Sequence, residues 1–185
     1  MKMNLVGAGY WGSKLLESLK QFDVDATVID IRNGQTIDDI NNNDPVILAT
    51  PLWQHHEQAV ELVKRGLDVY VEKPMAETAA EIEDIASYLK DDQLIMVGHI
   101  FLHHPQIKLI EDIVKSGDVG GILHIRSERS NWGIYQTKTD PVLSLATHDI
   151  SIVNHFQGPM EVVNAQSWNY SNNTVPDRVW FSGTP

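Results

Sequence analysis

Three glycines near the start of the sequence are spaced to bind a phosphate group. Gly7, Gly9 and Gly12 follow a short apolar run and precede a segment with helical periodicity. In the pattern Gly-x-Gly-x-x-Gly the chain turns tightly, brings bare backbone against a pyrophosphate and starts a helix whose N-terminus faces the phosphates. A tight turn without a ligand is the alternative, because isolated matches are common. The flanking strand and helix patterns favour a dinucleotide site.

An acidic residue lies where a ribose partner is expected. Asp30 ends the second strand-like run, about twenty residues after the glycines. A carboxylate there accepts hydrogen bonds from ribose hydroxyls and repels a 2′-phosphate, which favours NAD over NADP. Arg32 is near enough to weaken this preference, and a solvated turn carboxylate is the alternative.

Polar residues also follow the third and fourth strand-like runs. Thr50 and Pro51 end the third, with His55 in the helical segment behind them, and Lys73 follows the fourth within a Glu-Lys-Pro sequence. Ligands of open α/β sheets bind beyond the carboxyl ends of the strands, so we expect these residues to line the groove. A lysine there can donate to a substrate hydroxyl and stabilise a developing alkoxide, although an ordinary surface lysine is the alternative.

The elements that must position these residues alternate through the first half of the chain. Continuous apolar runs, as in parallel strands covered on both faces, are separated by segments of helical periodicity. This alternation predicts an α/β fold with a Rossmann-type doubly wound parallel sheet. The expected strands are residues 3–6, 26–30, 46–49, 69–71 and 94–97, and a further helix is expected within 77–90.

The pattern changes after residue 98. A helix ending at Gly117, an alternating run over 122–128, a helical piece around His148 and strand-like runs at 161–170 and 178–181 follow. We expect a nucleotide-binding domain at 1–98 and a partial substrate or oligomerisation domain at 99–185. The second would be a truncated α+β domain with a mostly antiparallel sheet. Its exposed face and edge predict a homo-oligomer formed through that sheet.

Composition excludes several classes of function. The net charge of −11 argues against nucleic acid or an anionic membrane as the main partner. The absence of cysteine excludes disulfides and thiolate chemistry. No apolar stretch is long enough to span a bilayer, and a strand so close to the first residue leaves no room for a signal peptide. We therefore expect a cytoplasmic protein.

Three histidines between residues 99 and 104 are candidate metal ligands. His99 and His103 have a spacing that could chelate a metal on a helix. Pro105 disfavours helical geometry before it, and no nearby carboxylate completes a ligand set. We expect no metal and place these histidines in a loop near the cofactor.

The order of these motifs resembles the family of NAD(P)-dependent oxidoreductases that includes glucose–fructose oxidoreductase, inositol dehydrogenase and the rhizopine-catabolism proteins. The resemblance covers nearly the whole chain, and Glu72-Lys73-Pro74 is its most specific signature. Residues 130–133, Asp140 and the run 142–151 look most like the members that oxidise UDP-N-acetylglucosaminuronate-type sugars.

The resemblance implies oxidation of a sugar or nucleotide-sugar hydroxyl by hydride transfer to the nicotinamide of NAD, with NADP less favoured. It places Lys73 and His148 at the reacting hydroxyl as catalytic residues. The residues expected to bind the cofactor are Gly7, Gly9, Tyr10, Trp11, Gly12, Asp30, Ile31, Thr50, Pro51, His55, Glu72 and Lys73. Those expected to bind the substrate are Lys73, His99, Asn131, Trp132, Ser144 and His148.

Two departures from the family keep an alternative open. The family usually carries an aspartate where this chain has Ser144, and a serine cannot stabilise an imidazolium at His148 by charge. Asp149 projects in another direction on a helix and is a poor replacement. Family members also continue beyond the residues present here. The alternative is a catalytically weak or inactive NAD-binding module, and a third possibility is an α/β protein that binds no nucleotide.

Overall fold

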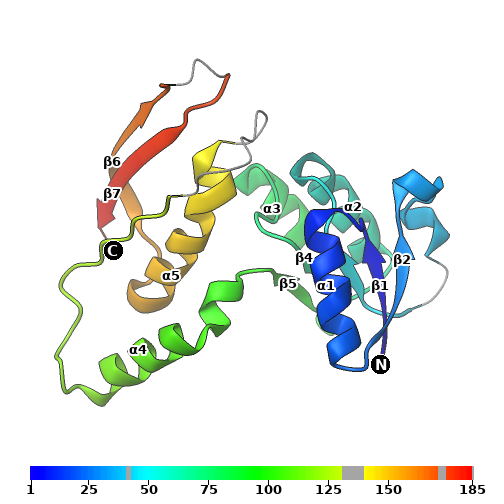
Figure 1. The fold of residues 1–185 in the computed structure, drawn as a ribbon, viewed down its shortest axis with the longest axis horizontal. Helices are drawn as coiled ribbons and strands as arrows, with labels where there is room; N and C mark the ends of the chain where they lie inside the picture. Colours follow the sequence, from blue (N-terminus) through cyan, green and yellow to red (C-terminus); the bar gives the residue numbers. More distant parts are fainter. Residues whose placement is uncertain (41–42, 131–139, 171–173, 185) are drawn as a thin grey trace. The chain divides into compact units, whose positions relative to one another are not determined.

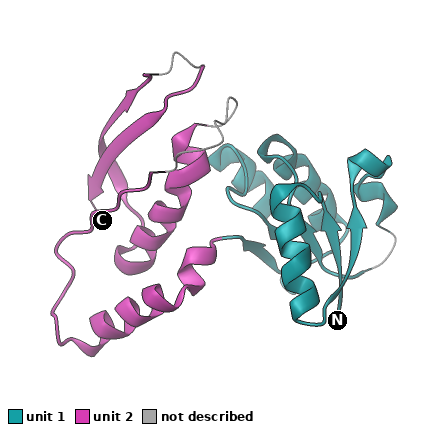
Figure 2. Cartoon of the chain, viewed as in Figure 1, with its two compact units in different colours: residues 1–98 teal, residues 99–185 magenta. Residues whose placement is uncertain are grey.

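The computed structural model describes residues 1–40, 43–130, 140–170 and 174–184. The chain divides into two compact units, Met1–Gly98 and His99–Pro185 (Figure 2). Each unit has its own sheet and is described by itself below.

The first unit is built on a parallel sheet of five strands in the order β2-β1-β3-β4-β5 (Figure 1). The strands are β1 (Lys2–Val6), β2 (Asp25–Ile29), β3 (Val46–Leu48), β4 (Val69–Val71) and β5 (Ile95–Val97). This confirms the predicted Rossmann-type sheet. Strand β1 pairs with β2 on one side and with β3 on the other. The chain therefore reverses direction across the sheet between β1 and β3, where open α/β sheets bind their ligands.

Among the described residues, three α-helices accompany this sheet, α1 (Tyr10–Gln21), α2 (Leu52–Lys64) and α3 (Ala79–Ser87), together with the short 3-10 helices η1 (Ile31–Asn33) and η2 (Ile37–Asp39). Helix α1 packs against β1 and β2, whereas α2 packs against β3, β4 and α3. Because parallel crossovers are right-handed and these two run in opposite directions across the sheet, α1 and α2 cover opposite faces. Helix α1 lies in front of the strands in Figure 1.

The ends of α2 and α3 follow from local sequence. Thr78 and Glu81 form a reciprocal capping box, so α3 begins later than the start of the expected 77–90 segment. Gly66, with φ of 83°, follows α2 and its N–H bonds to the Val63 carbonyl. Glycine adopts this left-handed conformation without steric cost, which ends the helix.

The core of the first unit lies between the sheet and α2. Leu48 and Val71 from neighbouring strands and Leu62 from α2 are completely buried. Truncating a buried leucine of this kind costs about 2–5 kcal/mol of folding free energy, because the surrounding atoms relax only partly into the space. The core therefore holds the carboxyl ends of β1, β3 and β4 in a fixed arrangement.

The second unit consists of helices and a two-stranded antiparallel sheet. Its elements are η3 (Ile100–His103), α4 (Pro105–Ser116), the π-helical turn η4 (Val142–Ala146), α5 (Thr147–Gln157), β6 (Glu161–Trp168) and β7 (Arg178–Thr184). Strands β6 and β7 pair with each other. No helix among the described residues is long and apolar enough to cross a membrane.

The alternating run over residues 122–128 forms no strand. Alternation makes one face of an extended segment apolar, but it does not supply hydrogen-bond partners for the backbone. A strand exists only where a second segment pairs with it, and the only strands paired in this unit, among the residues described, are β6 and β7.

Candidate functional site

Two glycines, one before α1 and one in its first turn, allow the tight turn between β1 and α1. Gly7 has φ of 87°, and a Cβ there would lie 2.9 Å from the carbonyl oxygen of Ala49 at the end of β3. A Cβ on Gly12 would lie 1.9 Å from the carbonyl oxygen of Gly7. Both positions therefore require glycine because of the fold itself, whether or not a ligand binds.

Gly9 has a different environment. Its φ of −69° suits any residue, and a Cβ there would meet nothing within 4 Å. It is the N-cap of α1, where no side chain caps the helix and the first turn has no acidic residue. Open backbone at the positive end of a helix is the environment that a pyrophosphate needs, so the loop fits a dinucleotide.

The first turn of α1 adds exposed aromatic rings and a positive charge. Tyr10 and Trp11, both predicted to bind the cofactor, are exposed. The Lys14 ammonium lies 4.7 Å from the centre of the Tyr10 ring and 5.3 Å from that of Trp11. The first half of α1 therefore carries a cation over its exposed rings, which further favours an anionic ligand.

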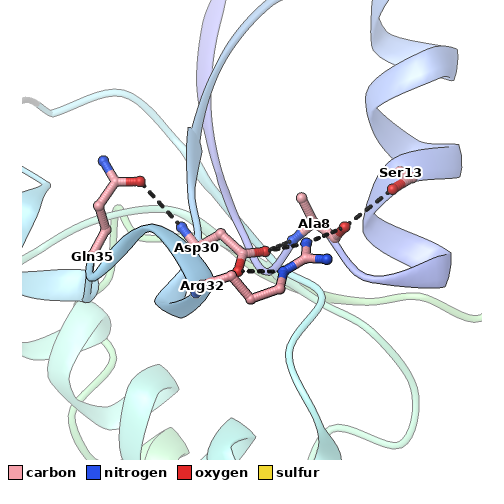
Figure 3. Close-up of polar contacts among 5 residues, drawn as sticks. All are labelled: Ala8, Ser13, Asp30, Arg32 and Gln35. Carbon is pink, nitrogen blue, oxygen red and sulfur yellow. Dashed lines mark hydrogen bonds and ion pairs between the residues drawn. The ribbon is translucent and has the colours of Figure 1, made fainter.

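Asp30 joins the end of β2 to the glycine loop (Figure 3). Its carboxylate accepts hydrogen bonds from the Ala8 N–H at 2.7 Å and from the Arg32 N–H at 2.9 Å, and the residue is 5% exposed. The pKa of Asp30 is held well below its usual range, first by the Arg32 side chain and then by these backbone donors. Asp30 is therefore an ionised group within reach of the loop.

The Arg32 side chain lies along the same carboxylate. Its Nε donates to Oδ1 of Asp30 at 2.8 Å, and its Nη2 lies 2.7 Å from both Oδ2 of Asp30 and the Ala8 carbonyl oxygen. The side chain nevertheless remains 65% exposed. Ile31, predicted to contact the cofactor, is exposed between these two residues.

His55, predicted to line the groove, is almost completely buried. The residue is 2% exposed, and its two ring nitrogens lie 2.8 Å from the Thr50 carbonyl oxygen and 2.9 Å from that of Pro74. Carbonyl oxygens only accept, so a neutral His55 ring, which carries a single N–H, donates to one of them at a time. His55 therefore lies between the turn after β3 and the turn after β4. Thr50 itself donates its hydroxyl to Oε1 of Gln58 at 2.7 Å, while Pro51 is exposed.

Glu72 is held by a residue that the sequence reasoning missed. The Tyr70 hydroxyl donates to Oε1 of Glu72 at 3.2 Å, and the Lys73 N–H lies 3.3 Å from Oε2. A Cβ on Gly98 would lie 2.5 Å from the Tyr70 hydroxyl oxygen, so this contact needs glycine at the end of β5. Burial, and then the Glu72 charge, raise the pKa of Tyr70 well above its usual value, which keeps the phenol a donor. The available signal was its position two residues before Glu72, on the same face of the strand.

In the second unit, His148 lies at the start of α5. It is 8% exposed, and its ring meets Phe101 edge to face, with centroids 4.8 Å apart. The Arg129 guanidinium lies 4.5 Å from the same phenyl ring, and its Nε donates to Asp149 at 2.7 Å. Burial raises the pKa of Asp149, but hydrogen bonds from Arg129 and from Ser127 outweigh it and the net pKa is lowered. Asp149 is thus bound to Arg129.

The remaining predicted substrate residues also belong to the second unit. The Ser144 hydroxyl, in the π-helical turn η4, donates to the Asp140 carbonyl at 2.8 Å. His99 is the N-cap of η3. Asn131 and Trp132 lie outside the described residues. Within those ranges, no group of three or more histidine or acidic side chains could hold a metal ion.

The structure therefore brings one set of predicted residues together at the carboxyl edge of the parallel sheet. The glycine loop follows β1, Asp30 follows β2, Thr50 follows β3 and the Glu-Lys-Pro turn follows β4. Lys73 belongs to the first unit and His148 to the second. Their meeting at one substrate hydroxyl remains a proposal.

Comparison with known proteins finds a matching family model over part of the first unit. Residues 13–99 match a family model described as an oxidoreductase family with an NAD-binding Rossmann fold. A curated relative, 2,7-anhydro-N-acetylneuraminate hydratase of Mediterraneibacter gnavus, is 26% identical over 146 residues, covering 69% of this chain and 39% of the relative. Levoglucosan dehydrogenase of Pseudarthrobacter phenanthrenivorans is 25% identical over 183 residues, covering 90% of this chain and 45% of the relative. The chain thus spans less than half the length of these relatives.

A solved structure has a similar fold over nearly all of the chain. The WlbA dehydrogenase from Bordetella pertussis, in complex with NADH and UDP-GlcNAcA, superposes with a TM-score of 0.78. The sequence identity is 19%, and the match covers 97% of this chain and 62% of that one. At this identity the likeness shows the fold alone.

Proposed function

We propose that this chain belongs to the oxidoreductase family whose model, with an NAD-binding Rossmann fold, matches residues 13–99, and that it oxidises a hydroxyl group of a sugar or nucleotide sugar. In this reaction the substrate carbon gives a hydride to the nicotinamide, the hydroxyl gives up its proton, and a carbonyl forms. We place the reaction in the cytoplasm and the protein in a homo-oligomer formed through β6 and β7.

The observation that carries the proposal is the environment of Gly9. The glycines on either side are required by the fold, whereas the fold makes no demand for a glycine at position 9. A glycine that packing does not require, at an uncapped helix N-terminus beside the Asp30 carboxylate, is best explained by a ligand that needs the space above it.

Two ionisable residues take the roles that this reaction needs. Lys73 donates a hydrogen bond to the reacting oxygen and stabilises its developing negative charge. His148 accepts the hydroxyl proton as general base. His99, Asn131, Trp132 and Ser144 contact the sugar around these two.

An aspartate at position 144 would stabilise the protonated form of His148 by its charge, and Ser144 cannot do so. The Ser144 hydroxyl donates to the backbone of Asp140, and Asp149 is bound to Arg129. These contacts favour, as a second candidate, a protein that binds NAD but transfers hydride slowly.

The first experiment separates turnover from binding. Purified protein is incubated with NAD and a panel of free sugars and UDP-sugars. Absorbance of the reduced nicotinamide and the mass of the sugar are both followed, because one relative is named a hydratase. We expect NADH and an oxidised sugar in equal amounts for at least one panel member. Tight NAD binding with no change in any sugar would instead support the second candidate.

The second experiment tests the base. His148→Ala should lower kcat by about 10²–10⁴-fold, the usual contribution of a general base, while the dissociation constant for NAD stays within about twofold of wild type. His124→Ala, at an exposed histidine of the same unit, is the matched control and should leave kcat unchanged. Undiminished turnover in the His148 variant would remove this residue from the mechanism.

A further inference from the structure

The lysine of the Glu-Lys-Pro turn lies between two residues that are each contacted by another side chain. After Lys73, the Pro74 carbonyl oxygen lies 2.9 Å from a ring nitrogen of the buried His55. Before it, Oε1 of Glu72 accepts a hydrogen bond from the Tyr70 hydroxyl at 3.2 Å. Neither His55 nor Tyr70 takes part in the proton or hydride transfer proposed above. The place of the lysine therefore depends on contacts that are separate from the chemistry.

Tyr70 is held in place by the parallel sheet. It is the middle residue of β4 and pairs with Ile47 of β3 on one side and with Met96 of β5 on the other. Side chains two residues apart on a strand project from the same face, so the phenol and the Glu72 carboxylate lie on one face of the sheet. Because β4 has a hydrogen-bonded neighbour on each side, the Tyr70 hydroxyl starts from a fixed backbone.

The space for this contact comes from Gly98, the residue after β5. A Cβ at this position would lie 2.5 Å from the Tyr70 hydroxyl oxygen, 3.1 Å from Cζ of the same ring and 3.3 Å from Oε1 of Glu72. Gly98 is buried, and its N–H donates to the Val71 carbonyl at 2.8 Å, which holds it against β4. Its φ is not positive, so the backbone conformation alone does not require glycine. The missing side chain therefore serves the contact between the phenol and the carboxylate.

The phenol is suited to hold a carboxylate in one place. Burial and the Glu72 charge raise the pKa of Tyr70, so the hydroxyl keeps its proton and remains a donor. A hydrogen bond to a charged oxygen is about twice as strong as one between neutral groups. The second carboxylate oxygen, Oε2, lies 3.3 Å from the Lys73 N–H. Glu72 therefore connects the phenol to the backbone of the lysine.

We propose that Tyr70 is a positioning residue that fixes the Lys73 turn through Glu72, in a space that Gly98 keeps open. The consequence for the reaction rests on the role proposed above for Lys73. Its ammonium must lie at the reacting oxygen as negative charge develops there. Since a misplacement of about 1 Å can cost about 10²-fold in rate, losing the phenol contact lowers the rate of the chemical step.

The first test needs no turnover. Hydrogen exchange of the whole chain, followed by mass spectrometry, compares wild type with Tyr70→Phe, which keeps the ring and removes the hydroxyl. We expect amides in the peptide covering residues 72–76 to exchange at least about threefold faster, because the turn opens locally more often. Peptides from β1 and α2 should exchange as in wild type. Unchanged exchange at 72–76 would overturn the inference, and so would faster exchange throughout the unit, which would show a general loss of stability.

A second variant breaks the same contact from the other side. In Gly98→Ala the new Cβ would displace the Tyr70 hydroxyl, so exchange at residues 72–76 should again be faster. Added to Tyr70→Phe it should have little further effect, because the nearest ring atom would then be Cζ at 3.1 Å. Tyr88→Phe removes the hydroxyl of an exposed tyrosine in the same unit and is the matched control, with no change expected in any peptide. Additive effects of the first two substitutions would contradict a shared contact.

Kinetics test the consequence for the reaction, on a sugar that the wild type oxidises and at saturating NAD. Tyr70→Phe should lower kcat about tenfold and leave KM for the sugar within about threefold, because Lys73 meets the full negative charge only in the transition state. In a Glu72→Ala background the same substitution should change kcat by less than about threefold, since no carboxylate remains to be held. An undiminished loss in that background would show that Tyr70 does not act through Glu72. If no sugar is oxidised, the proposed function fails, while hydrogen exchange still decides whether Tyr70 fixes the turn.

Discussion

Asp30 is almost fully buried, while the arginine that bonds to it is mostly exposed. The contact therefore does two things of different strength. Hydrogen bonds from the backbone of Ala8 and Arg32 hold a charged group inside the protein, where losing a partner is costly. The side-chain pair, screened by water on one side, contributes less to folding.

Asp30→Asn should lower the free energy of unfolding by about 1–3 kcal/mol at pH 7, because an amide cannot accept all four bonds with full charge. The pKa of Asp30 is lowered in the folded protein, so its stabilisation is complete above the ordinary aspartate value of about 3.9 and is lost as pH falls through the lower folded value. Denaturant unfolding at pH 7, 5 and 3.5 should therefore show the difference between wild type and variant shrinking only at the lowest pH.

Asp92→Asn, at an exposed position outside this network, is the control for that measurement. It should leave the free energy of unfolding unchanged at each pH. A difference for Asp30→Asn that stays constant down to pH 3.5 would contradict the assignment of the lowered pKa to this residue.

The three glycines of the turn between β1 and α1 differ in whether the fold leaves room for a side chain. Gly7 and Gly12 let the loop fold back against β3 and against itself, whereas Gly9 leaves open backbone at the helix N-terminus. In this turn, Gly7 and Gly12 are therefore needed for folding, whereas we expect Gly9 to be needed for binding the ligand. The same substitution, glycine to alanine, made at Gly9 and at Gly12 tests this difference.

Gly9→Ala should fold like wild type, with an unchanged melting temperature, and should bind NAD at least tenfold more weakly because the new methyl group occupies the space for the pyrophosphate. Gly12→Ala should lose about 1–3 kcal/mol of folding free energy, because its Cβ would overlap the Gly7 carbonyl oxygen. Gly121→Ala, which meets open space in the second unit, is the control. Unchanged NAD affinity in the Gly9 variant would exclude the pyrophosphate from this loop.

The two-stranded sheet of the second unit exposes apolar side chains. Strand β6 is exposed at every residue except its last. The exposed apolar side chains of the sheet include Val162 and Val163 on β6 and Trp180 on β7. Two strands alone are marginally stable in water, so a sheet of this kind gains from being covered. This supports the proposed homo-oligomer.

Trp180→Glu should therefore weaken self-association, because it places a charge on the apolar sheet. Sedimentation velocity over a range of concentrations should give a larger monomer fraction for this variant than for wild type. Val119→Glu alters an exposed apolar residue away from the sheet and should leave the distribution unchanged. Equal distributions for wild type and Trp180→Glu would argue against association through β6 and β7.

Strand positions in the first unit were predicted to within a residue or two from the sequence. Parallel strands buried on both faces must be continuous apolar runs, so each is visible without knowledge of its neighbours. The segment over residues 122–128 shows the limit of this reasoning. Its alternation was genuine, but no strand in the described part of the chain pairs with it.

The amino-acid sequence by itself determined the glycine loop, the acidic residue after β2 and the Glu-Lys-Pro turn, because these depend on local backbone geometry and on residue type. Only the tertiary structure decided which side chains meet. The parallel pairing of Val6 with Ile29 brings Ala8 to Asp30 and Arg32, and the packing of α2 brings His55 between two turns. Such contacts join residues far apart in the chain, so no local pattern encodes them.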